Sequence, residues 1–67
     1  MNKYEAKQAL SEGKKITHDY FCENEFVNRD SEDNSVLVFE DGVKQDENEF
    51  WKMRSDNSWY EGWEIVK

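Results

Sequence analysis

The side chains with the most chemical potential lie in one short stretch, which contains His18, Asp19 and Cys22. A structural zinc site takes four Cys or His ligands, whereas this chain has one histidine and one cysteine. His18 and Asp19 would also point to opposite faces if this stretch is a strand. We therefore predict no catalytic residue, metal site or cofactor here. His18 is expected at the surface or at a sheet edge, and Cys22 as a small buried hydrophobic residue.

Neither the carboxylates nor the glycines form a complete metal-binding or phosphate-binding motif. Asp30, Glu32 and Asp33 resemble a calcium loop, but the glycine and the distal bidentate glutamate of such a loop are missing. The three glycines are isolated from one another, so no phosphate-cradling motif is present. We predict that the chain is not an enzyme.

Acidic residues are concentrated in the middle of the chain. The net charge is −7, from 9 basic and 16 acidic residues. Between residues 23 and 49, ten acids face only Arg29 and Lys44, a local net charge of −8. This charge either keeps a small aromatic-rich domain soluble or steers it to a basic partner. Direct binding of nucleic acid is disfavoured, because phosphate contacts need clustered Lys and Arg. The predicted acidic partner-binding face consists of Glu23, Glu25, Asp30, Glu32, Asp33, Glu40, Asp41, Asp46, Glu47 and Glu49.

Aromatic residues are the second unusual feature. Trp51, Trp59, Tyr60 and Trp63 lie within thirteen positions. In a 67-residue chain, large rings are first needed for the core, and only a surplus is free to contact a base or a partner protein. The candidate aromatic anchors are Tyr20, Phe21, Trp51, Trp59 and Tyr60. Because so small a core is marginally stable, we also expect a homodimer or larger assembly.

In so short a chain, only a few helices and strands are available to position these side chains. Residues 2–12 are predicted as a helix: Asn2 and Glu5 form a capping box, and Ala6, Ala9 and Leu10 share one face. Gly13 then suits the left-handed position after the helix.

Strands are predicted at residues 15–18, 25–28 and 36–39, with residues 43–46 either a further strand or a loop. Val36 to Phe39 is the only run of four apolar residues, which predicts a central strand buried on both faces, although a buried helical turn has the same pattern. For residues 47–54 a short strand or an extended segment is favoured, with Phe50 and Trp51 on opposite sides. Alternation over residues 59–66 predicts a closing strand. The expected fold is a single α+β domain, residues 1–67, with one N-terminal helix packed on a small antiparallel sheet of about four strands.

Both ends of the chain resemble a group of small bacteriophage proteins. The opening runs from Tyr4 through Glu12-Gly13-Lys14-Lys15 to Thr17, and the end is Trp63-Glu64-Ile65-Val66. The group includes the anti-Thoeris nucleotide sponges, and relatives have been linked to anti-CRISPR activity. The resemblance implies a helix on a small antiparallel sheet, a phage source and a counter-defence role by binding.

Two functions therefore come from the sequence. The first is a non-enzymatic phage accessory protein that inhibits a host defence protein with a basic surface, as a nucleic-acid mimic in one version. The second is an oligomeric sponge for a nucleotide immune signal, in which Tyr20, Phe21 or Trp59 would stack on a base. Glu23 and Glu25 would repel a phosphorylated ligand. No long apolar segment is present, so we expect a cytoplasmic protein of the infected host without a membrane span.

Overall fold

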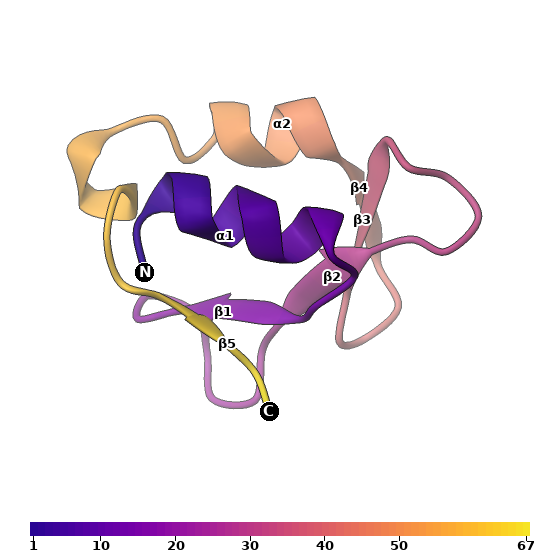
Figure 1. Ribbon diagram of the computed structural model, residues 1–67, viewed down its shortest axis with the longest axis horizontal. Coiled ribbons are helices and arrows are strands. Elements are labelled where there is room, and N and C mark those ends of the chain that lie inside the picture. Colours follow the sequence, from indigo (N-terminus) through magenta and orange to yellow (C-terminus); the bar gives the residue numbers. More distant parts are fainter.

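Two helices lie on the same face of a five-stranded antiparallel sheet in the computed structural model, which describes residues 1–67 (Figure 1). The predicted α+β fold is confirmed, with one more strand and one more helix than expected. The elements are α1 (Lys3–Ser11), β1 (Ile16–His18), β2 (Val27–Arg29), β3 (Val36–Phe39), β4 (Lys44–Asp46), α2 (Glu47–Lys52), the 3-10 helix η1 (Asn57–Trp59) and β5 (Trp63–Ile65).

Helix α1 forms as the sequence predicts. The Asn2 side chain accepts a hydrogen bond from the Glu5 amide, and the Glu5 carboxylate accepts one from the Asn2 amide, both at 2.9 Å. These bonds satisfy amides that the first helical turn leaves unpaired. The small residues Ala6 and Ala9 are buried with Leu10, which lets the helix lie close to the sheet.

The strand order β4-β3-β2-β1-β5 corrects the prediction that Val36 to Phe39 is the central strand. That place belongs to β2, and β3 lies between β2 and the edge strand β4. Only Leu37 of β3 is fully buried, so the strand is not covered on both faces as expected. Because both helices lie on one side, Val36 and Val38 project from the other side of the sheet and stay partly exposed.

Helix α2 corrects the extended segment predicted for residues 47–54. Asp46 caps it by accepting a hydrogen bond from the Glu49 amide at 3.2 Å. Phe50 and Trp51, expected on opposite sides of a strand, both enter the core. Neighbours on a helix are about 100° apart, so two consecutive residues can face the same core.

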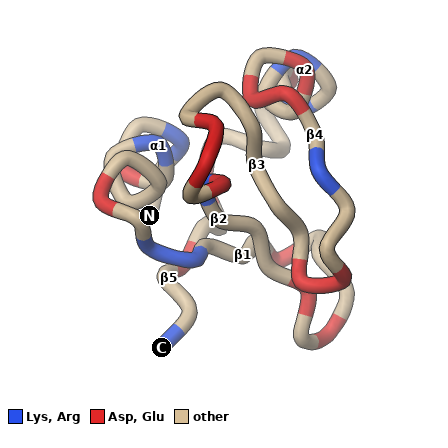
Figure 2. The backbone as a smooth tube through the Cα atoms, turned by 90° about the vertical axis from the view of Figure 1, so that its right-hand side faces the viewer, with Lys and Arg blue, Asp and Glu red and all other residues tan.

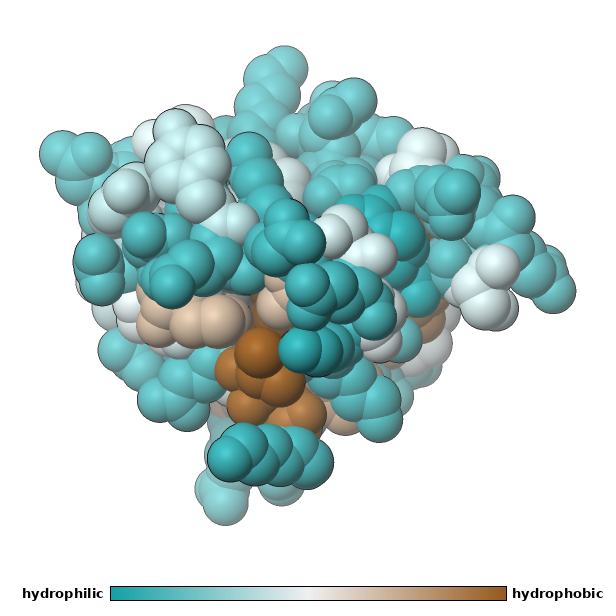
Figure 3. All heavy atoms as spheres, in the orientation of Figure 1, coloured by the Kyte–Doolittle hydropathy of each residue, from teal (hydrophilic) through white to brown (hydrophobic).

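The C-terminal strand is shorter than predicted. Only Trp63–Ile65 pairs with β1, while the preceding residues form η1 and a turn at Gly62, whose φ is +94°. Trp63 is fully buried, whereas Ile65 is 37% exposed. Figure 3 shows a small hydrophobic patch near this end of the chain on an otherwise mostly hydrophilic face.

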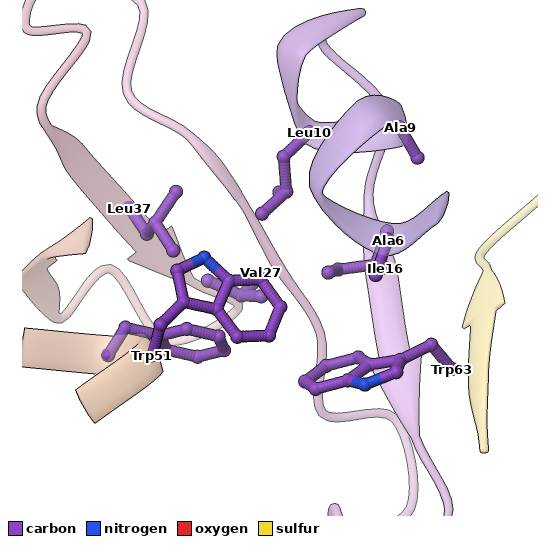
Figure 4. Packing of buried hydrophobic residues seen from close by; sticks show 9 residues of the cluster. Ala6, Ala9, Leu10, Ile16, Val27, Leu37, Trp51 and Trp63 are labelled. Atoms are coloured by element: carbon purple, nitrogen blue, oxygen red, sulfur yellow. The ribbon is translucent and has the colours of Figure 1, made fainter. Parts of the chain in front are cut away.

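The core lies between the sheet and the two helices. Trp51 of α2 and Trp63 of β5 approach with ring centres 5.1 Å apart, beside Leu10 and the inward residues Ile16 and Val27 (Figure 4). These residues come from every layer of the fold, so a single cluster ties the elements together. Neither α1 nor α2 has the length and apolar character needed to cross a bilayer.

Candidate functional site

His18 is buried, which corrects its expected place at the surface or at a sheet edge. Its side chain is 5% exposed and lies in β1 opposite Trp63. The Tyr20 amide donates to Nδ1 at 3.0 Å, and Nε2 lies 2.6 Å from the Glu61 carbonyl oxygen. Because a carbonyl oxygen only accepts, Nε2 donates to it, while Nδ1 accepts from the Tyr20 amide. His18 therefore connects two loops and has no free nitrogen for catalysis.

Aromatic rings surround this histidine. The ring centres of Trp59, Trp63 and Tyr20 lie 4.5, 4.7 and 5.0 Å from that of His18. Trp63 is buried and Trp59 is half-buried, while Tyr20 is 62% exposed. The cluster therefore extends from the core to the surface, and Tyr20 is its most exposed ring.

Arg54 is a member of this cluster that the sequence did not reveal. Its guanidinium carbon lies 4.0 Å from the ring centre of Phe50 and 5.0 Å from that of Trp59. Nη1 donates to the Phe50 carbonyl oxygen at 3.1 Å, and Nε is buried without a hydrogen-bond partner. Burial lowers the pKa of Arg54, and the charge of Glu25 partly opposes that effect. No motif in the sequence links Arg54 to these rings, because the contacts arise only after α2 and η1 fold.

The predicted aromatic anchors divide into two groups. Trp51 is only 9% exposed, and its indole nitrogen donates to the Glu47 carboxylate at 3.2 Å, so it serves the core. Tyr20 and Tyr60 are exposed, and Phe21 and Trp59 are half-buried. The number of aromatic side chains that the core does not need is therefore one tryptophan lower than the sequence predicts.

The ten central acids lie mainly at the end of the molecule formed by β2, β3, β4 and their loops. Figure 2 looks onto this end and shows acidic segments in α2, in the loop before β3 and in the β3–β4 turn. Only Asp30 and Glu47 form ion pairs, with Lys44 at 3.6 Å and Arg29 at 2.6 Å. The hydrogen bond from Arg29 lowers the pKa of Glu47. The other eight acids have no cationic partner within 4 Å.

Some of these acids have local structural roles. Asp46 caps α2, and Glu25 accepts a hydrogen bond from the Cys22 amide at 2.8 Å. Asp33 accepts from the Ser35 hydroxyl at 2.7 Å, which lowers the pKa of Asp33. By contrast, the side chains of Glu23, Glu32 and Glu49 accept no hydrogen bond and form no ion pair within the protein.

One surface pocket of about 310 Å³ opens where β1 and β2 separate beyond the Ile16–Val27 pair. Its lining residues are Thr17, Asn24, Glu25, Phe26 and Val66. No Lys or Arg lines it, although the Lys15 ammonium lies 4.7 Å from the centre of the Phe26 ring.

Cys22 is exposed, which corrects its expected burial. No group of three His, Cys, Asp or Glu side chains converges in a way that could hold a metal ion.

Comparisons of the chain with family models, curated proteins and solved structures find no match.

Proposed function

We propose that this chain is a non-enzymatic binding protein that docks onto a basic surface of a partner protein. The docking surface is the acidic end, defined as the ten acids between residues 23 and 49. One observation carries the proposal: eight of these acids lack a cationic partner, although the chain has nine basic residues. Charges left unpaired on one end of a small domain attract a basic partner over distances near the Debye length.

Imitation of nucleic acid is the version that this arrangement supports best. Duplex DNA carries one negative charge per about 1.7 Å of its axis. The acidic end spreads its carboxylates over loops and strand ends of a molecule that measures 30 × 23 × 20 Å, which is enough to imitate a short patch of duplex. The proposed partner is therefore a nucleic-acid-binding protein such as a nuclease, helicase or restriction complex. The resemblance to phage counter-defence proteins makes such a partner a component of host defence, inhibited by occupation of its basic surface.

The composition of the surface pocket favours this function over capture of a nucleotide. Glu25 lines the pocket, and Phe26 is its only aromatic residue. A phosphorylated ligand needs several donors or cations, and a carboxylate in the lining opposes its charge. Tyr20, Phe21 and Trp59, the rings expected to stack on a base, are not among the lining residues.

The test is affinity capture from bacterial lysate with a pair of charge-matched variants. The double variant Glu32→Gln/Glu49→Gln removes two charges from the acidic end, and Glu12→Gln/Glu64→Gln removes two charges elsewhere. The wild-type protein and the second variant should retain DNA-binding proteins that short duplex DNA displaces. The first variant should retain several-fold less.

Salt and ligand content distinguish the remaining outcomes. Capture that is unchanged by high salt, or reduced equally by both double variants, would contradict docking through the acidic end. Native mass spectrometry of the protein purified from signal-producing cells is a separate measurement. A retained nucleotide there would support the sponge instead.

A further inference from the structure

The two loops joined by His18 form a second polar and aromatic surface. Residues 19–20 follow β1 and residues 59–62 precede β5, and the Asp19 amide donates to the Gly62 carbonyl oxygen at 3.2 Å. His18 adds a hydrogen bond to each loop. Two hydrogen bonds therefore join the loops, and the bond from the Tyr20 amide to His18 orders the first loop, so the side chains they present are pre-organised for binding.

The exposed groups of this surface have complementary chemistry for a cation. The Tyr20 ring is largely exposed and packs edge-on against Trp59, with ring centres 5.2 Å apart and planes at 89°. Asp19 precedes Tyr20 in sequence and Glu61 follows Trp59 by two residues, and both carboxylates are exposed without an ion pair. An aromatic face attracts a cation through its quadrupole, and adjacent carboxylates add charge and hydrogen-bond acceptors.

We propose that this surface, named here the Tyr20 surface, binds an arginine side chain from an extended segment of a partner protein. The guanidinium would stack on Tyr20 and donate hydrogen bonds to Asp19 and Glu61. Arginine fits better than lysine, because its planar group can stack on a ring and donate to a carboxylate at the same time. The proposal does not depend on the acidic end.

The chain already contains one guanidinium held in this way. Arg54 stacks on Phe50 and lies near Trp59. Because Phe50 is fully buried, this guanidinium lies on the core side of the cluster. The same aromatic cluster thus accommodates one internal arginine without an ion-pair partner. The outer ring, Tyr20, offers the equivalent contact to an arginine from outside, and there carboxylates are available as well.

Titration with a short peptide, followed by NMR of the labelled full chain, tests the proposal. The probe is acetyl-Gly-Arg-Gly-amide, and its control replaces arginine with citrulline, which has nearly the same shape but no charge. Shifts on addition of the arginine peptide should concentrate at Asp19, Tyr20 and Glu61 and at the indole of Trp59. The citrulline peptide should cause much smaller shifts at the same concentration.

Charge-matched variants separate this surface from general attraction by an acidic protein. Asp19→Asn/Glu61→Gln should weaken peptide binding by about two- to fivefold, the range expected for loss of exposed ion pairs. Glu32→Gln/Glu49→Gln, which alters the acidic end, should leave the affinity within experimental error. Equal loss in both variants, shifts spread over the ten central acids, or no shifts at all would overturn the proposal. Each result is independent of the lysate capture, so failure of one proposal leaves the other standing.

Discussion

At the scale of single residues, Gly62 and His18 determine how the loops beside β1 and β5 meet. Gly62 has a φ of +94°, and a Cβ there would lie 2.9 Å from the Asp19 carboxylate and 3.0 Å from Nε2 of His18. Two features therefore require glycine at position 62: the positive φ of its backbone and the close approach of β1. His18 uses both of its nitrogens within the fold.

Gly62→Ala is expected to lower the free energy of unfolding more than Gly13→Ala does. Both positions have positive φ, which costs a residue with a Cβ about 1–2 kcal/mol. Gly13 has no atom within 4 Å of a new Cβ, whereas Gly62 adds the steric overlap with Asp19 and His18. Urea unfolding followed by tryptophan fluorescence measures both. Equal midpoints would show that the loop relaxes without cost.

His18→Phe should destabilise the protein by about 1–3 kcal/mol even though it keeps an aromatic ring. The change leaves the partly buried Tyr20 amide and Glu61 carbonyl oxygen without their partner, and unpaired polar groups shielded from water are costly. Tyr20→Phe, which removes only a hydroxyl from an exposed ring, serves as the control and should be close to neutral. A His18→Phe protein as stable as this control would contradict the role of His18 as a link between the loops.

At the scale of elements, an ion pair connects the first turn of α2 to the sheet. Arg29 of β2 pairs with Glu47 through Nη1, and the same Arg29 nitrogen donates to the Asn34 carbonyl oxygen. Glu47 also accepts from the indole of Trp51. The Arg29–Glu47 pair thus joins a strand, the loop before β3 and the helix, the loop being bound through Arg29.

This arrangement predicts a dependence of stability on pH. The pKa of Glu47 is lowered from its ordinary value of 4.5, first by the hydrogen bond from Arg29. A lowered pKa in the folded protein means that the stabilisation is complete above about pH 4.5 and is lost as pH falls through the folded value. Glu47→Gln should cost about 1–2 kcal/mol at neutral pH and progressively less in acid.

Urea midpoints measured from neutral pH to about pH 3 check this expectation. Glu49→Gln in the same helical turn is the matched control, because Glu49 accepts no hydrogen bond through its side chain and forms no ion pair. A constant difference between Glu47→Gln and the wild type over the whole range would contradict the assigned ion pair.

Most elements could be predicted from the sequence where local signals agree. The capping box before α1 and the strands β1 to β3 follow from short-range patterns. Helix α2 could not be predicted, because its six residues are too few for a helical period to show. The place of β3 in the sheet also depends on which strands pair, and this information is not local. Its apolar run looked doubly buried, yet both helices cover the same face.

Within the candidate site, the acids could be identified by counting but the aromatic cluster could not. The density of charge between residues 23 and 49 is visible in the sequence, and the fold brings most of that charge to one end. The burial of His18 brings it to Glu61, 43 residues later in the chain, and Arg54 contacts Trp59 only after α2 and η1 have formed, so the spacing of neither residue indicates its surroundings. Assigning Trp51 to the core likewise required the helix.

At the scale of the whole molecule, the distribution of charge is a source of internal repulsion. The net charge of −7 lies mostly at one end, where eight acids lack partners. Repulsion of this kind destabilises the compact state, and salt screens it. The same charge that would attract a partner therefore limits the stability of the isolated chain.

Glu40→Lys should accordingly raise the free energy of unfolding at low salt, by a few tenths to about 1 kcal/mol. Glu40 lies beside Asp41, and its amide donates to the Phe26 carbonyl oxygen, close to Glu25. Glu64→Lys, at the other edge of the sheet, has the same change in charge and should help less. Urea unfolding at low and high salt measures both, and a gain for Glu40→Lys that persists undiminished at high salt would argue against repulsion as its cause.

The exposure of Cys22 makes this protein easy to label at one defined position. It is the only thiol in the chain, and it follows Tyr20 and Phe21 and precedes Glu23. A maleimide fluorophore attached there would stand between the aromatic loop and the first of the central acids. Its emission or anisotropy would therefore report occupancy of either surface without any change to the tryptophans.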